Sequence, residues 1–180
     1  HITREDVWLD RASQAKGFVE AMWDEPERHF WTGTLEDGVT INKEVLPVDV
    51  NTWGLMGLGK EDKYGAGIAW VENFCKVDPC PTCKEAGDYW KGFDFSFDRV
   101  DASNNKDGIW WEGTAQMCVA YQIKGDSDKS DEFLGELCRV QTSANNNNEK
   151  GIVAACHDGV ITGFEYDWGP WVYYNRLHIG

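Results

Sequence analysis

Two carboxylates occupy positions where acid/base chemistry can be organised, and the first is Asp49. It follows Pro47 and Val48 at the predicted start of a helix, where the helix dipole stabilises a negative charge. The same position is ordinary for an acid that only caps the helix backbone. Asp49 is therefore a catalytic candidate with a plain structural alternative.

Glu112 is the second candidate, since it lies between the pair Trp110-Trp111 and Gly113. A carboxyl group among indole rings is expected to lose part of its hydration, which would raise its pKa toward the range of a general acid. The alternative is again an acid in the first turn of a helix. Two adjacent indoles cannot both face inward on one helix, so we expect one of them to line a cleft.

A third stretch follows near the end of the sequence and combines polar and aromatic groups that suit the binding of hydroxyls. Its candidates are His157, Asp158, Tyr174, Arg176 and His178. For Arg176 and His178, an exposed surface position or a satisfied place in the core is the structural alternative.

A calcium loop is considered and set aside. Asp101, Ser103, Asn105 and Asp107 alternate, and Glu112 is twelfth from Asp101, but the sixth position is a lysine where an EF-hand needs glycine. We expect a polar turn there, with no metal and no cofactor.

The cysteines are Cys75, Cys80, Cys83, Cys118, Cys138 and Cys156. An even number without another redox motif favours disulfides and an oxidising compartment, and hence an extracellular or secreted protein. Buried free thiols and zinc stay open as alternatives. Cys80-Pro-Thr-Cys83 has zinc-ligand spacing, but no second such pair or nearby histidine completes a tetrahedral set.

Composition narrows the choice of partner. The 180 residues carry a formal charge of −14, which disfavours nucleic acid, and no apolar run is long enough to cross a membrane. Ten tryptophans exceed ordinary usage; most must pack in a core, and the rest can cover the apolar faces of sugar rings.

Apolar periodicity predicts how these candidates are positioned. Helices are predicted over residues 7–23, 48–58, 64–74, 112–124 and 129–140, and a sixth begins within 168–178. A β-hairpin or ordered loop is predicted over 30–41 and a strand-like stretch over 93–98. We therefore predict an all-α domain of antiparallel α-hairpins spanning residues 1–180, with elaborate loops and the functional groups gathered at one end.

Several motifs resemble the six-hairpin glycosidase-like superfamily, and the similarity runs along nearly the whole chain. They are Phe18-Val19 with Met22-Trp23-Asp24, Thr32-Gly33-Thr34, Asp37-Gly38-x-Thr40-Ile41-Asn42, Asp49-Val50-x-Thr52-Trp53, Trp111-Glu112-Gly113-Thr114-Ala115-Gln116-Met117, Asp158-Gly159-x-x-Thr162-Gly163-Phe164 and Tyr173-Tyr174-Asn175-Arg176-Leu177-His178. The resemblance implies an (α/α) toroid with a carbohydrate cleft at its loop end. A complete toroid needs a longer chain, so we expect a fragment or half of one, completed by further residues or by self-association.

The resemblance also implies roles, since hydrolases of this architecture use paired carboxylates. Glu112 would be the proton donor and Asp49 or Asp158 its partner. Sugar platforms would be Trp53, Trp111 and Tyr174, and the groups that hold hydroxyls or carboxylates would be Gln116, Arg176 and His178, with His157 also in the site.

The expected function is that of a carbohydrate-active enzyme, a glycoside hydrolase acting on a glycan or oligosaccharide. One alternative is a sugar epimerase or lyase, in which His157 and His178 move protons. The other is a non-catalytic glycan-binding or structural extracellular assembly protein, in which the carboxylates only cap helices.

Overall fold

The computed structural model describes residues 6–59, 62–85, 88–144, 146, 148 and 150–176, and it shows a mixed α/β fold. The helices are α1 (Asp6–Ala21), α2 (Val48–Leu58), α3 (Asp62–Cys75), α4 (Trp111–Lys124), α5 (Ser127–Ser143) and the short 3-10 helix η1 (Ala102–Asn104). The strands are β1 (Trp23–Asp24), β2 (His29–Phe30), β3 (Gly33–Thr34), β4 (Ile41–Asn42), β5 (Val45–Pro47), β6 (Lys76–Val77), β7 (Lys84–Glu85), β8 (Asp88–Tyr89), β9 (Gly92–Phe93), β10 (Ser96–Asp98), β11 (Val160–Tyr166) and β12 (Gly169–Tyr173).

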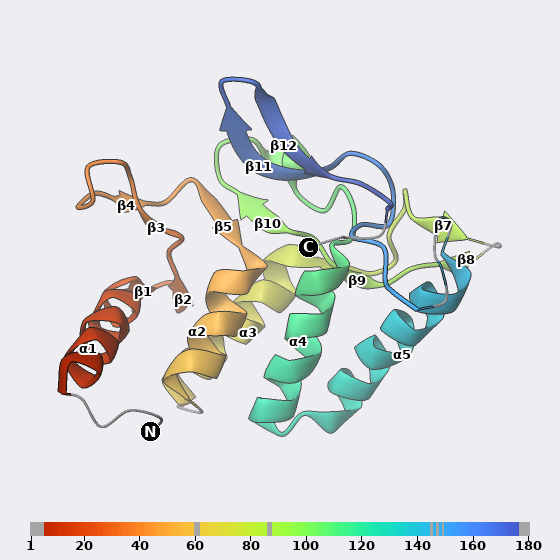
Figure 1. Ribbon diagram of the computed structural model, residues 1–180. Coiled ribbons are helices and arrows are strands. Elements are labelled where there is room, and N and C mark those ends of the chain that lie inside the picture. The colour runs from red at the N-terminus through yellow and green to blue at the C-terminus, as the bar shows by residue number, and fades with distance from the viewer. Residues whose placement is uncertain are drawn as a thin grey trace.

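Four of the helices form two antiparallel hairpins, α2–α3 and α4–α5, and α2 packs beside α4 (Figure 1). The predicted positions of these helices are confirmed within a few residues. Gly125 ends α4 in the left-handed conformation (φ 78°, ψ 19°), which costs glycine no steric penalty. The Asp126 side chain then accepts the Lys129 amide and caps α5. The short connection makes the two helices neighbours.

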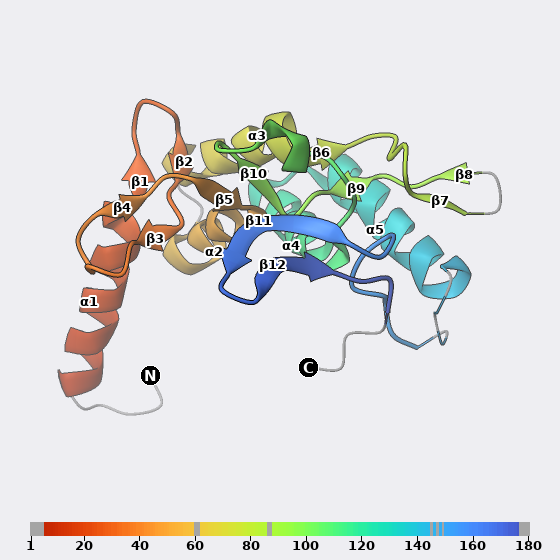
Figure 2. The same cartoon turned by 90° about the horizontal axis from the view of Figure 1, so that it is seen from above.

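The strands form small antiparallel pairs that lie over one end of the helical layer (Figures 1 and 2). The pair β5–β10 aligns Pro47 with Ser96, immediately before α2 begins. The pair β11–β12 aligns Val160 with Tyr173 and forms a longer ribbon above the starts of α2 and α4. The elaborate connections therefore do gather at one end, as β-hairpins.

The prediction of an all-α fold that forms part of an (α/α) toroid is wrong. The clearest departure is the predicted sixth helix over residues 168–178, where β12 forms instead. Glycines explain the difference, because Gly163 and Gly169 have φ of 80° and 120°, which permit a bulge and a tight turn between two strands. Pro170 and the β-branched and aromatic residues beside it also favour a strand over a helix.

One hydrophobic core holds the helical layer and the strands together, and cysteines as well as aromatic residues contribute to it. Its largest fully buried side chains include Trp111, Tyr121, Phe30, Phe93 and Phe133. None of the described helices is both long enough and apolar enough to cross a membrane.

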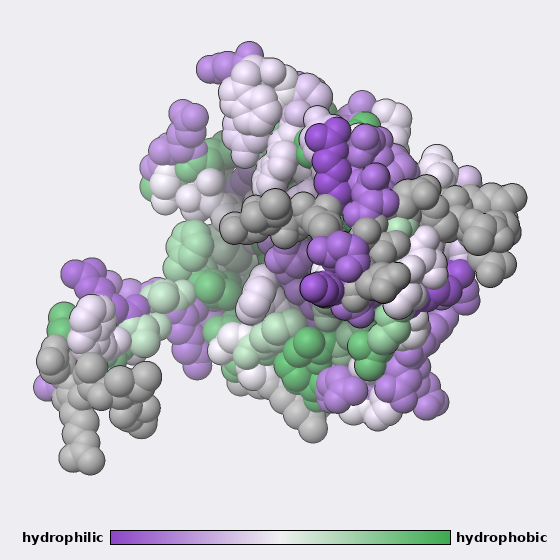
Figure 3. Space-filling model, turned by 45° about the vertical axis from the view of Figure 1, so that its right-hand side comes forward, coloured by the Kyte–Doolittle hydropathy of each residue, from purple (hydrophilic) through white to green (hydrophobic). Residues whose placement is uncertain are grey.

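Helix α1 stands apart from this core. It buries no residue, and Val7, Trp8, Leu9 and Phe18 are each about half exposed. In Figures 1 and 3 it projects from the body as a separate lobe. The chain joins the core at the end of α1, where Val19 packs against it and, just beyond, the Trp31 amide donates to the Met22 carbonyl.

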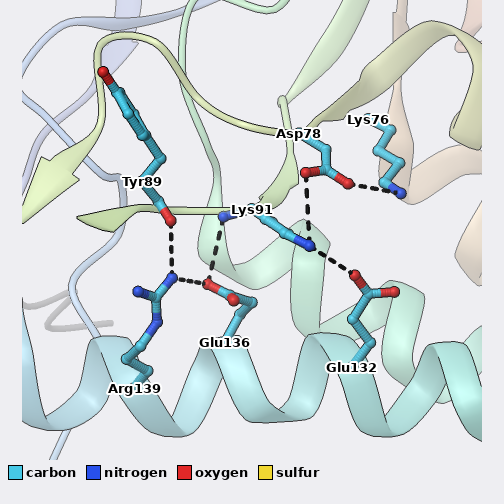
Figure 4. A network of polar contacts seen from close by, with 7 residues as sticks. All are labelled: Lys76, Asp78, Tyr89, Lys91, Glu132, Glu136 and Arg139. Carbon is cyan, nitrogen blue, oxygen red and sulfur yellow. Dashed lines mark hydrogen bonds and ion pairs between the residues drawn. The ribbon is translucent and has the colours of Figure 1, made fainter. Parts of the chain in front are cut away.

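The segment that carries Cys80 and Cys83 is tied to α5 by polar contacts (Figure 4). The Lys91 ammonium lies 3.3 Å from Glu132, and the Lys91 amide donates to Glu136 at 3.4 Å. Arg139 donates to the Tyr89 carbonyl at 3.0 Å. Each exposed ion pair contributes little alone, but together these contacts fix the position of the segment.

Candidate functional site

The first turns of α2 and α4 lie side by side beneath the β11–β12 ribbon, and a cleft of about 350 Å³ opens between them. Asp49 and Glu112, which are far apart in the sequence, both line it. The complete lining is Thr32, Pro47, Asp49, Val50, Phe95, Trp110, Glu112, Phe164, Trp171 and Tyr173. The structure thus brings Asp49 and Glu112 to one cleft, without Asp158.

Aromatic rings form one wall of the cleft, and each is positioned by its neighbours. Phe95 lies 4.8 Å from Trp110 and 5.5 Å from Tyr173, centroid to centroid. Trp171 lies 5.6 Å from Tyr173, and Phe164 lies 6.3 Å from Trp171. These rings come from β12, from β11 and from the two segments on either side of β10, so the wall is held by packing between elements and is preformed.

Asp49 is the carboxyl whose ionisation the site opposes. Burial raises its pKa above the ordinary value, and the negative charge of Glu112 raises it further, while a hydrogen bond from the Val50 amide acts in the opposite direction. Burial together with the charges of Glu112 and Asp49 also raises the pKa of Tyr173 to about 12. The charge of Glu112 therefore acts on both Asp49 and Tyr173 across the cleft.

Gln116 connects the two helices behind Glu112. Its amide oxygen accepts from the Thr52 hydroxyl of α2 at 2.7 Å, and its amide nitrogen donates to Glu112 at 3.4 Å. The reverse amide orientation would set the oxygen against the Glu112 carboxylate. Gln116 and Thr52 are both buried, so Glu112 is held from one side by a fixed donor.

The predicted desolvation of Glu112 falls on Asp49 instead. Glu112 is exposed where it lines the cleft, whereas Asp49 is half-buried. Of the two adjacent indoles, Trp110 lines the cleft, whereas Trp111 is only 1% exposed and packs edge-on against Trp90 in the core. Trp111 therefore presents no open face to a sugar ring.

Trp53 and the third stretch lie outside the lining of the cleft in the described part of the chain. Trp53 is exposed on α2. Asp158 accepts the Asn175 amide at 2.9 Å and lies 3.8 Å from Arg176, so it fastens the base of the ribbon.

Both ring nitrogens of His157 face backbone carbonyls, those of Asp107 and Asp158, at 3.0 and 2.9 Å. Tyr174 is exposed beside Arg176. His178 lies outside the described residues.

Only Asp49 and Glu112 of the lining were among the predicted site residues. The aromatic residues Phe95, Phe164, Trp171 and Tyr173 of the wall were not. A signal for them was present. The alternation Phe93, Phe95, Phe97 predicts a strand with its rings on one face. The alternation of Trp171 and Tyr173 likewise predicts a strand with both rings on one face.

A second buried carboxyl, Asp94, has a structural role. It accepts the amides of Phe95 and Lys106 at 2.7 and 2.5 Å, and burial raises its pKa well above the ordinary value. The neighbouring Asp101 accepts from Ser103 and caps η1. The predicted polar turn is therefore present, and it holds Phe95 at the edge of the cleft.

Three cysteines converge at the far side of Trp110. The sulfurs of Cys80, Cys83 and Cys156 all lie within 4.8 Å of one another, and Cys83 contacts each of the other two at bonding distance. The predicted capacity for disulfides is confirmed. Cys75 and Cys118 are buried free thiols, and burial raises the pKa of Cys118 to about 11.

Comparisons of the chain with models of protein families, with curated proteins and with solved structures find no match.

Proposed function

We propose that the cleft binds a glycan and that the protein hydrolyses a glycosidic bond with a pair of carboxylates. The observation that carries the proposal is the arrival of Asp49 and Glu112, from the first turns of two different helices, on one preformed aromatic cleft. Glycoside hydrolysis needs one carboxyl that donates a proton and a second that acts as base or nucleophile.

The lining of the cleft supports a sugar ligand. Indole and phenyl faces cover the C–H surfaces of a pyranose ring, while Thr32 and the carboxylates can bind its hydroxyls. The volume of about 350 Å³ suits one or two sugar rings. Trp171 and Tyr173, which are only partly buried, are the expected platforms in place of Trp53, Trp111 and Tyr174.

The two carboxyls differ in a way that assigns their roles. The raised pKa of Asp49 retains its proton to higher pH, which suits the general acid. Glu112 is exposed and accepts the Gln116 amide, which suits the base or nucleophile. The roles are therefore the reverse of those implied by the resemblance, and Asp158 has no part in the proposed pair.

The epimerase or lyase alternative depended on two histidines. His157 has both ring nitrogens directed at backbone carbonyls and does not line the cleft, so nothing in its surroundings favours proton transfer to a sugar. The cysteine pairs at disulfide distance favour an oxidising environment, and we propose that the protein acts outside the cell.

The test compares Asp49→Asn and Glu112→Gln with a matched control, Asp128→Asn. Asp128 is likewise an exposed first-turn acid, but it begins α5 at the opposite end of the helical layer (Figure 1). Each protein is offered a panel of α- and β-linked oligosaccharides, with new reducing ends measured for turnover and calorimetry for binding.

We expect both cleft variants to lose at least about 100-fold in turnover while they still bind, because removal of an acid or base costs that much. The control should turn over like the unmodified protein. If turnover is absent but binding depends on Trp171 and Tyr173, the protein is a glycan-binding module. If all three acids matter only through equal losses of stability, they are helix caps and the glycan proposal fails.

A further inference from the structure

We propose that Cys80, Cys83 and Cys156 form a thiol–disulfide exchange site in which Cys83 is the shared sulfur. Its Cα lies 5.1 Å from that of Cys80 and 5.5 Å from that of Cys156, and both distances permit a disulfide. A sulfur in a disulfide has one sulfur partner, so these two bonds exclude each other. The third cysteine is then a thiol in contact with a disulfide.

The backbone holds the three groups in order. Cys80 and Cys156 are 4.0 Å apart, beyond bonding distance, while each contacts Cys83. Cys80 and Cys83 are both buried and lie three residues apart in one loop. Cys156 is half-buried and enters from a distant segment. Cys83 therefore lies between its two partners.

The exchange is balanced without an external reagent. The Cys80 thiol loses its proton, and its thiolate attacks Cys83 in the Cys83–Cys156 disulfide. The Cys80–Cys83 bond forms, the Cys83–Cys156 bond breaks, and the electron pair leaves on Cys156, which takes up a proton. Forming the first disulfide from thiols requires a two-electron oxidant, such as glutathione disulfide.

One hydrogen bond and its greater exposure support Cys156 as the leaving group. The Ile109 amide donates to the Cys156 sulfur at 3.1 Å, which stabilises a thiolate. Cys156 is also the most accessible of the three, so its proton can come from solvent. At the other end, the Thr82 hydroxyl lies 3.3 Å from the Cys80 sulfur.

The two connectivities differ in what they join. Cys83–Cys156 links segments separated by 73 residues, whereas Cys80–Cys83 spans only 3. Ala155 pairs with Trp110 of the cleft, so the long-range bond fastens the chain that leads into β11. When the Cys80–Cys83 bond replaces the Cys83–Cys156 bond, the segment that leads into β11 is no longer covalently held.

Zinc is the competing occupant of these thiols. Within the described residues, the group of potential ligands contains only these three, with no fourth histidine, carboxylate or cysteine to complete a tetrahedral site.

The test is a map of disulfides in the intact protein across a series of glutathione ratios. Samples are quenched with acid, free thiols are alkylated, and peptides are analysed by mass spectrometry. We expect both connectivities in one preparation, with Cys80 alkylated in one population and Cys156 in the other. Cys80→Ser should leave only Cys83–Cys156, and Cys156→Ser only Cys80–Cys83. Cys138→Ser, which removes an exposed cysteine outside the cluster, should leave the ratio unchanged.

A single connectivity in the unmodified protein at every glutathione ratio would overturn the proposal. One equivalent of zinc per chain with all three thiols reduced would also overturn it. These readouts need no glycan, so they are independent of the proposed hydrolysis.

Discussion

The contact between Thr52 and Gln116 offers a quantitative test of how the cleft is held. Thr52→Val keeps the shape of the side chain but removes the hydroxyl that donates to the Gln116 amide oxygen at 2.7 Å. Gln116 is buried, so loss of this donor leaves the desolvation of its oxygen uncompensated. The expected loss is about 1 to 3 kcal/mol in the free energy of unfolding.

The Thr52 hydroxyl also lies 3.1 Å from the Asp49 carbonyl and 3.4 Å from that of Val48. These two carbonyls lose little hydrogen bonding in the variant. Val48 and Asp49 lie in the first turn of a helix, where the carbonyls already accept intrahelical hydrogen bonds. The cost therefore falls on Gln116. Removing both partners, in Thr52→Val with Gln116→Met, should restore part of the stability, with a coupling energy of about 1 to 2 kcal/mol.

The assay is urea unfolding followed by tryptophan fluorescence. With a slope of about 2 kcal/mol per molar urea, a loss of about 2 kcal/mol lowers the midpoint by about 1 M with no change of slope. Thr52→Ser keeps the donor and should stay much closer to the unmodified midpoint. An unchanged midpoint for Thr52→Val, or strictly additive single and double variants, would refute the proposed link between α2 and α4.

Asp49→Asn should gain stability relative to the unmodified protein as pH rises from about 3 to about 7. The pKa of Asp49 is raised in the folded protein, so its ionisation above its ordinary pKa destabilises the fold, and asparagine avoids that cost. A tenfold change in the ionisation equilibrium corresponds to about 1.4 kcal/mol. Thermal unfolding across that pH range measures the difference. Gly113→Ala should displace the Trp110 ring, which a Cβ would overlap, at a cost of about 1 to 3 kcal/mol and with weaker binding in the cleft. Gly135→Ala, with open space around it, should be neutral or stabilising by up to about 1 kcal/mol. Cys156→Ser should lower unfolding stability under oxidising conditions by up to about 4 kcal/mol, because its disulfide closes a loop of 73 residues, and should have little effect in reductant.

Helices were the most predictable part of the fold, because each has a local cause. Pro47 before α2 and Gly125 after α4 mark boundaries that depend only on neighbouring residues. The strands were harder to predict, since most are two or three residues long and depend on partners distant in sequence. The aromatic residues of a stretch such as 168–178 are compatible with both the helix period and the strand period, and only the pairing with β11 decides between them.

The candidate site was predicted in part for the same reason. Asp49 and Glu112 could be predicted as site residues because each lies in the first turn of a helix. Both helices begin at the end of the helical layer where the long connections lie. The difference in burial between the two acids could not be found, since it depends on the ribbon that covers Asp49 and leaves Glu112 exposed. Trp111 was misplaced because the choice between two adjacent indoles depends on the packing of Trp90.

The isolation of α1 has a consequence for the cooperativity of the whole molecule. A 16-residue helix that buries no side chain shares almost none of the contacts that make the core melt as one unit. Its helix–coil equilibrium is therefore governed by its own backbone and by whatever covers Val7, Trp8 and Phe18. Opening of α1 and global unfolding are two separate events in this chain, and only the second disturbs the cleft.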